Sequence, residues 1–209
     1  MSKNHPFRAA ALIVLPILVL ASCQAMPDRD ERGEIVDNSR TELKHMIEKD
    51  PQLETMLKES AGYAMFPEVG KGGLLFGGAF GRGAVYERGG KFIGYATVSQ
   101  ASVGGVVGGQ MYAQLLVFQD NERLESFKKG DRVRFGAQAS AIAITDGAAN
   151  ATEYDDGVAV FIMPRGGLMA DASLSGQEFK FVRADEADVT RDTNRDPAYD
   201  SADSAMLDD

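Results

Sequence analysis

The sequence is poor in the residue types on which metal binding and catalysis most often depend. Its 209 residues include one Cys, two His and no Trp. One Cys cannot form an internal disulfide, and two His with one Cys cannot build a typical structural zinc site. We therefore expect no disulfide, no metal site and no cofactor. With so few His and Cys residues, catalysis through either residue type has little support.

A surplus of positive charge is also missing. Lys and Arg number 22 against 31 Asp and Glu, which gives a formal net charge of -9. Nucleic-acid binding needs Lys and Arg gathered on one face, so we expect no nucleic-acid partner. Residues 184–209 alone carry nine acids against Arg191 and Arg195, with few large apolar residues between them. This composition predicts a disordered acidic tail over residues 184–209.

An apolar run near the N-terminus is too short to cross a membrane. It covers Ala9–Ala21 and follows two basic residues, whereas a spanning helix needs about 20 apolar residues. The run therefore predicts a signal peptide over residues 1–22. Leu20-Ala21-Ser22-Cys23 resembles the lipobox of bacterial lipoproteins, in which cleavage precedes the Cys and acyl chains such as palmitate are attached to it. We expect lipidation of Cys23; an ordinary signal peptide with an incidental Cys is the alternative.

The residues after Cys23 bear on localisation and domain boundaries. Gln24 stands where lipoproteins retained at the inner membrane typically carry Asp. This resemblance implies a lipid anchor in the bacterial cell envelope, at the periplasmic face of the outer membrane. Residues 23–33 are polar and lack periodicity, which predicts a tether. The folded domain is then expected over residues 34–183.

Helical patterns are expected before the core of the domain and once within it. Ser39 and Glu42 have the spacing of a capping box, and the apolar periodicity after them predicts a helix that ends near residue 50. Asp50-Pro51 has the pattern of an N-cap followed by Pro, which predicts a second short helix. A third helix is predicted over Asp120–Lys129.

Glycine dominates the middle of the sequence. Fifteen of the 23 glycines lie between Gly62 and Gly109, a composition that disfavours helices and permits closely packed strands. Strands are predicted at residues 83–86, 92–98, 103–118, 132–145, 153–163, 167–172 and 179–182, with a hairpin turn at 87–91. Residues 103–118 fit either one long strand or two strands with a glycine bend. Strands and helices do not alternate as β-α-β units. The sequence therefore predicts an α+β fold: a glycine-rich antiparallel β sheet, sandwich or barrel-like domain with N-terminal helices and one mid-domain helix.

No catalytic constellation stands out in the sequence. Val69–Gly73 is rich in glycine but lacks the G-x-x-x-x-G-K-[ST] order of a phosphate loop. The acids of the folded part are scattered, and nothing selects two that share a cleft. We therefore expect a protein that is not an enzyme. A hydrolase that uses these carboxylates is an alternative supported only by their abundance.

An ordered series of motifs resembles the SYLF domain family. The matching segments follow in the family's order: Ala64–Gly73, Phe76–Gly78, Gly81–Tyr86, Ser99–Gln110, Gln114–Phe127 and Gly166–Gly176. Arg165-Gly166 departs from the family's pattern, in which Ser-Lys or Lys-Gly is usual. The resemblance spans residues 35–183.

The resemblance implies a lipid-binding module, since eukaryotic members are associated with phosphoinositide membranes and fungal members with actin. An envelope compartment offers no actin, and phosphoinositides are not its common lipids, so contact with anionic lipid in general is what the resemblance implies here. Such contact needs cations near an apolar surface. The candidate lipid-binding residues are Lys71, Arg82 and Arg165 at motif positions, and the basic group Lys128, Lys129, Arg132 and Arg134.

Two functions follow as expectations. The first is a membrane-anchored envelope lipoprotein with a lipid-binding domain that catalyses no reaction. The alternative is a structural or interaction lipoprotein that docks another envelope protein, with the lipid serving only to localise it. The basic group of residues 128–134 also fits a solvated helix end, where Lys is favourable in any case.

Overall fold

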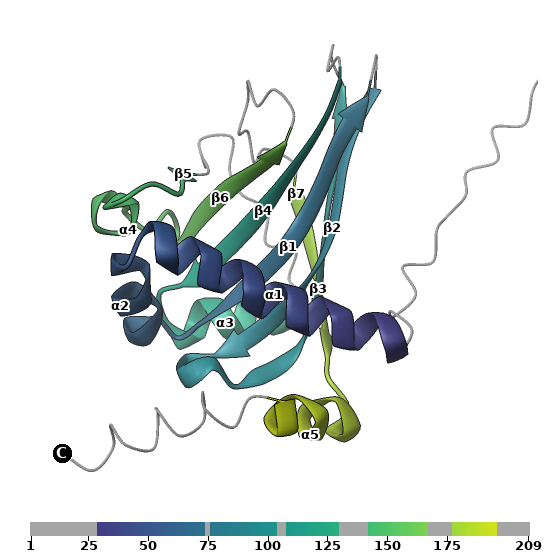
Figure 1. Ribbon diagram of the computed structural model, residues 1–209, viewed down its shortest axis with the longest axis vertical. Helices are drawn as coiled ribbons and strands as arrows, with labels where there is room; N and C mark the ends of the chain where they lie inside the picture. The colour runs from purple at the N-terminus through teal and green to yellow at the C-terminus, as the bar shows by residue number, and fades with distance from the viewer. Residues whose placement is uncertain (1–28, 74–75, 104–107, 130–141, 167–176, 196–209) are drawn as a thin grey trace, which may run out of the picture.

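A seven-stranded sheet with helices on both faces forms the body of the protein (Figure 1). The computed structural model describes residues 29–73, 76–103, 108–129, 142–166 and 177–195. Helix α1 (Arg29–Lys49) crosses one face of the sheet, and α2 (Gln52–Glu59) lies beside its end. Helix α3 (Asn121–Lys128) packs on the opposite face through Leu124 and Phe127. The predicted α+β class, with N-terminal helices and one mid-domain helix, is confirmed.

The strand order of the sheet is β5-β6-β4-β1-β2-β3-β7. The strands are β1 (Gly62–Gly73), β2 (Phe76–Glu87), β3 (Phe92–Val103), β4 (Gly108–Phe118), β5 (Ile142–Ala143), β6 (Val158–Gly166) and β7 (Gln177–Arg183). Neighbouring strands are antiparallel, except that β5 runs parallel to β6. The sheet is mostly antiparallel, as expected, and it is not closed into a barrel. A short 3-10 turn, Arg88–Gly90, joins β2 and β3 where the hairpin turn was predicted.

Helix α1 begins earlier than the sequence predicts. Its first residue is Arg29, so residues 29–33 belong to a helix and not to the predicted tether. Ser39 lies inside the helix, and its hydroxyl donates a hydrogen bond to the Met65 carbonyl, 3.1 Å away. The predicted capping box is therefore wrong. The helix extends past it because Val36, one turn before Ser39, is buried against the sheet.

Asp50 confirms its predicted role at the start of α2 and also connects two helices. Its buried carboxylate accepts a hydrogen bond from the Gln52 amide at 3.2 Å. It also accepts one from the Ala149 amide at 2.7 Å, in α4 (Ala148–Ala151). One side chain thus satisfies the otherwise unpaired N–H groups of two helix starts.

The sheet is buried on both faces because it curls. Residues such as Met65, Leu115 and Phe161 point toward α1 and α2 and form one apolar core. On the other face, the rings of Phe66 in β1 and Phe179 in β7 lie 5.7 Å apart, although β2 and β3 separate these strands in the sheet. Because the sheet curls around this second core, little of either face is exposed to solvent.

The predicted acidic tail is partly wrong. Residues 186–195 form helix α5 (Glu186–Arg195), which lies under the N-terminal half of α1 (Figure 1). Arg32 and Arg40 of α1 hold it through ion pairs to Asp188, at 3.1 Å, and Asp192, at 2.9 Å. Both acids are buried, so the helix forms because α1 supplies partners for its charges. Residues 196–209, the predicted signal peptide, residues 132–141 of the strand predicted at 132–145 and the strand predicted at 167–172 lie outside the described residues.

Candidate functional site

Two large apolar side chains lie exposed on the same row of the sheet. Phe80 of β2 and Met111 of β4 are the exposed large hydrophobic residues within the described ranges, at 46% and 42%. Each pairs with Gly70 of β1, which lies between them. Because directly opposed residues share a face of the sheet, Phe80 and Met111 point the same way, about 10 Å apart.

Glycines keep the surface around these side chains flat. Gly72 of β1 pairs with Gly78 and Gly109 in the next row on the same face. A Cβ atom added at Gly70 or Gly109 would meet no atom within 4 Å. We call residues 70–72, 78–80 and 109–111, from three adjacent strands, the strand tip. The strands carry it beyond the region that α1 covers (Figure 1).

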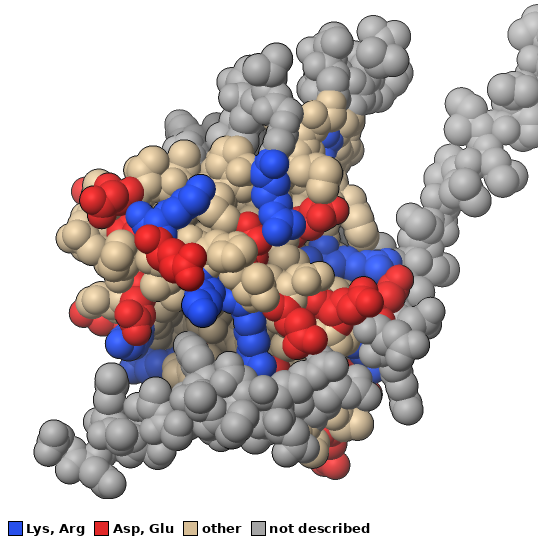
Figure 2. Space-filling model, in the orientation of Figure 1, with Lys and Arg blue, Asp and Glu red and all other residues tan. Residues whose placement is uncertain are grey.

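The strand tip carries very little charge. Lys71 is its one charged residue, and it lies on the face opposite Phe80. No ionisable side chain occurs between Lys71 and Arg82, or between Lys91 and Asp120, apart from tyrosines. The nearest acid along the row is Glu178 of β7, which pairs with Ser99 beyond Phe80. Acidic and basic side chains are instead mixed over α1 (Figure 2).

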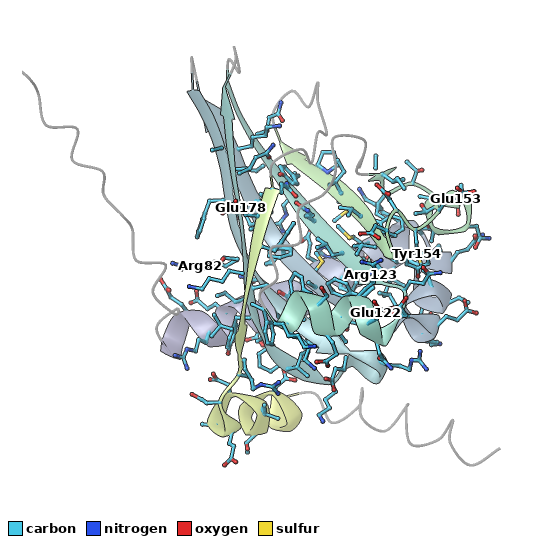
Figure 3. All side chains as sticks on the ribbon, turned by 180° about the vertical axis from the view of Figure 1, so that it is seen from behind. Arg82, Glu122, Arg123, Glu153, Tyr154 and Glu178 are labelled. Carbon is cyan, nitrogen blue, oxygen red and sulfur yellow. The ribbon has the colours of Figure 1, made fainter. Side chains whose placement is uncertain are left out.

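Arg82 lies at the base of the strand tip, between the apolar row and α1. Its guanidinium carbon is 5.7 Å from the centre of the Phe80 ring. The same guanidinium donates a hydrogen bond to Glu31 in the first turn of α1, at 2.9 Å. Figure 3 shows Arg82 at the level of α1 and below the ends of the strands. Arg82 therefore lies beside an exposed aromatic ring, and its charge is paired with Glu31, an acid whose side chain is itself about half exposed.

The other predicted cations do not join this site. Lys128 is only 9% exposed, and its ammonium group lies 3.1 Å from Glu87 and 2.6 Å from Glu125. Burial lowers the pKa of Lys128, but its hydrogen bonds with these two acids outweigh burial and raise it overall. Lys129 is exposed at the end of α3, and this helix lies toward the other end of the sheet from the strand tip (Figure 1). Arg132 and Arg134 lie outside the described residues.

Arg165 is engaged in an ion pair. It donates to Glu42 of α1 at 2.6 Å and lies 3.7 Å from Glu68. The Glu42 carboxylate is almost completely buried, so Arg165 compensates a charge that would otherwise be costly. The sequence grouped Arg165 with Lys71 and Arg82 by motif alone. The structure places it on β6, beside α1, where it stabilises the fold.

A buried polar network on the other face of the sheet was missed from the sequence. Gln114 of β4 donates to Gln177 of β7 at 2.9 Å, and Gln177 donates to the Tyr112 hydroxyl at 3.3 Å. Burial raises the pKa of Tyr112 to about 12, which outweighs the lowering effect of the hydrogen bond from Gln177. The network is therefore neutral at physiological pH and offers no general base.

The described part of the chain offers no other chemical centre. It contains no group of three or more His, Cys, Asp or Glu side chains arranged to hold a metal ion. Within the same residues, every helix is too short or too polar to span a bilayer. The strand tip is thus the feature of the described surface that departs most from an ordinary charged exterior.

Comparison with known proteins agrees with the motifs in the sequence. Residues 99–189 match the family model described as Las17-binding protein actin regulator (Ysc84). The chain is also 27% identical over 144 residues to Beta cell expansion factor A of Aeromonas veronii. That alignment covers 66% of this chain and 52% of the relative, so the chain spans about half the relative's length. The matched residues contain the glycine-rich, strand-then-helix and closing motifs identified above, so both comparisons support the resemblance of this chain to the SYLF domain family.

Proposed function

We propose that the protein is an envelope lipoprotein whose SYLF domain binds anionic membrane lipid through the strand tip. The match to the family suggests lipid binding or an actin-regulator-like function, and the family is not a known enzyme family. The observation that carries the proposal is the pairing of exposed Phe80 and Met111 across Gly70, with Arg82 beside the ring. An uncharged apolar surface bordered by a cation matches the boundary between lipid headgroups and acyl chains.

The proposal includes an anchor at Cys23. The lipobox-like sequence supports lipidation of the thiol after cleavage of residues 1–22. Gln24 supports sorting to the periplasmic face of an outer membrane. The anchor fixes the domain near lipid, and the strand tip then needs only weak affinity to stay in contact with the surface.

Co-sedimentation with vesicles tests the proposal on the mature chain without its anchor, made as residues 23–209 with Cys23→Ser. We expect more binding to phosphatidylglycerol vesicles than to phosphatidylcholine vesicles at low salt, and less as salt screens the charges. Near an anionic surface each cation contributes about 1 kcal/mol, so Lys71→Gln is expected to weaken binding about fivefold.

Glu178→Gln is the matched control, because this acid lies at the outer edge of the same row. Removal of this negative charge is expected to strengthen binding to anionic vesicles and to leave binding to neutral vesicles unchanged. Equal binding to both vesicle types, or none to either, would contradict the proposal. A stoichiometric envelope protein in crosslinking experiments, without lipid binding, would favour the alternative of a protein-docking lipoprotein.

A further inference from the structure

We infer that the strand tip contacts the same bilayer that holds the lipid anchor, with the strands standing end-on to the membrane and α5 facing away from it. The inference rests on the proposed function and adds the partner membrane and the orientation of the domain. It depends on four observations: the reach of the chain before α1, the level at which α1 begins, the approach that the helices leave open, and the distribution of charge along the strands.

The chain between Cys23 and α1 is short. Six Cα–Cα steps separate Cys23 from Arg29, the first residue of α1. A fully extended chain spans at most about 3.6 Å per residue, so the start of α1 must stay within about 21 Å of the acylated Cys. An anchored domain therefore cannot place its strand tip against a second, distant membrane without pulling α1 away from its own anchor.

The start of α1 lies at a level from which the strand tip can reach that bilayer. The hydrogen bond from Arg82 to Glu31 fixes the first turn of α1 beside β2 at Arg82. Five residues of extended strand separate Arg82 from Gly77, near the end of β2, a distance of about 17 Å. Because this distance is below the reach of about 21 Å, one bilayer can hold the anchor and touch the ends of β1, β2 and β4.

End-on contact is also the approach that the helices leave open. Helix α1 covers the same face of the sheet on which Phe80 and Met111 lie, and it would hold a flat membrane away from that face lower down. The ends of the strands extend past α1, and α2, α3 and α5 all lie toward the other end (Figure 1). A bilayer that meets the ends of the strands contacts no helix first.

The charges at the two ends of the sheet favour the end-on orientation at an anionic bilayer. The strand tip holds Lys71 and no acid. At the other end, α5 and the residue before it carry four acids (Asp185, Glu186, Asp188 and Asp192) against Arg191 and Arg195, an excess of two acids. The ion pairs from Arg32 and Arg40 keep α5 on the side of α1 away from the strand tip. In the end-on orientation the cation approaches the lipid surface and these acids stay distant from it.

Fluorescence quenching in vesicles tests the orientation on the full, acylated protein. Ala101→Cys places a label near the end of β3, and Ala187→Cys places one on α5; both positions are exposed. Since the thiol of Cys23 is occupied by lipid in this protein, each introduced Cys is the one site of labelling. With quencher attached to the lipids of phosphatidylglycerol-containing vesicles, we expect severalfold stronger quenching of the label at 101 than at 187.

A second variant separates docking of the strand tip from simple proximity to the anchor. Adding Phe80→Ser and Met111→Ser to the Ala101→Cys protein is expected to reduce quenching while the protein stays bound to the vesicles. Stronger quenching at 187, equal quenching at both labels, or no effect of the two Ser substitutions would overturn the inference. Vesicle binding by the anchor-free chain would still stand in those cases, so failure of the orientation and failure of lipid binding are distinguishable.

Discussion

Replacing Cys23 by Ser is expected to abolish incorporation of a palmitate analogue into the protein and to stop its processing. In the lipobox chemistry the thiol accepts a diacylglyceryl group before the peptidase cleaves, and a hydroxyl cannot replace it. One myristoyl chain gives only reversible binding, whereas each buried CH₂ adds about 0.8 kcal/mol, so several chains make attachment effectively permanent. The effect of the substitution should therefore be all or none.

The measurement is metabolic labelling followed by mass spectrometry of the N-terminal peptide. Wild type should yield a peptide that begins at Cys23 and carries acyl chains, and Cys23→Ser should yield the uncleaved chain without label. Ser22→Ala is the matched control, because it keeps a small residue before the Cys and should be labelled normally. A mature wild-type N-terminus at another residue, or label that persists in Cys23→Ser, would exclude this form of anchoring.

The second large effect concerns glycine in the sheet. Gly83→Ala is expected to lower the free energy of unfolding by about 3 kcal/mol or more, since overpacking alone costs about 1–3 kcal/mol and the backbone must also shift. A Cβ at this position would clash with the Met65 carbonyl oxygen and lie 2.9 Å from the Phe66 ring. The clash lies next to the irregularity in the β1–β2 register between Met65 and Glu68. Such a loss is a large share of the stability of a typical domain.

Gly70→Ala is the control for this prediction, because its added Cβ meets nothing within 4 Å. It should change the unfolding free energy by less than about 1 kcal/mol in either direction. Urea denaturation followed by circular dichroism measures both variants. Similar unfolding midpoints for Gly83→Ala and Gly70→Ala would mean that glycine at residue 83 is not required for strand packing.

These two glycines also show where sequence analysis reaches its limit. The density of glycine in this part of the chain correctly predicted a β region, but it left open whether the glycines serve close packing or loop mobility. The structure gives two reasons, because Gly83 admits a neighbouring carbonyl while Gly70 leaves an open surface. Composition cannot separate these roles, since each depends on a strand that is distant in the sequence.

Local patterns were reliable where local contacts decide the structure. Asp50-Pro51 started a helix as predicted, and the turn between β2 and β3 lies where expected. The capping box at Ser39 and Glu42 was wrong because both side chains make tertiary contacts, to Met65 and Arg165. These partners are distant in the sequence, so a local sequence pattern cannot reveal them.

The site and α5 depend on long-range pairing in the same way. Phe80 and Met111 are far apart in the sequence, and only their common pairing with Gly70 brings them into one row. Alternation within each strand predicts which face each residue takes, but the register between strands was not available from the sequence. Helix α5 likewise depends on Arg32 and Arg40, so its composition alone indicated disorder.

The measurement that tests the central claim most directly is the partition of anchor-free protein onto phosphatidylglycerol vesicles, with and without Phe80→Ser and Met111→Ser. Both side chains are about half exposed, so we expect a loss of about 1 kcal/mol from each, or about thirtyfold together. Val182→Ser removes a partly exposed apolar side chain from β7, away from the strand tip, and should have little effect. We predict that the double variant loses binding, that Val182→Ser keeps it, and that the unfolding temperature of the double variant is unchanged. Equal partition of wild type and the double variant would contradict binding through the strand tip.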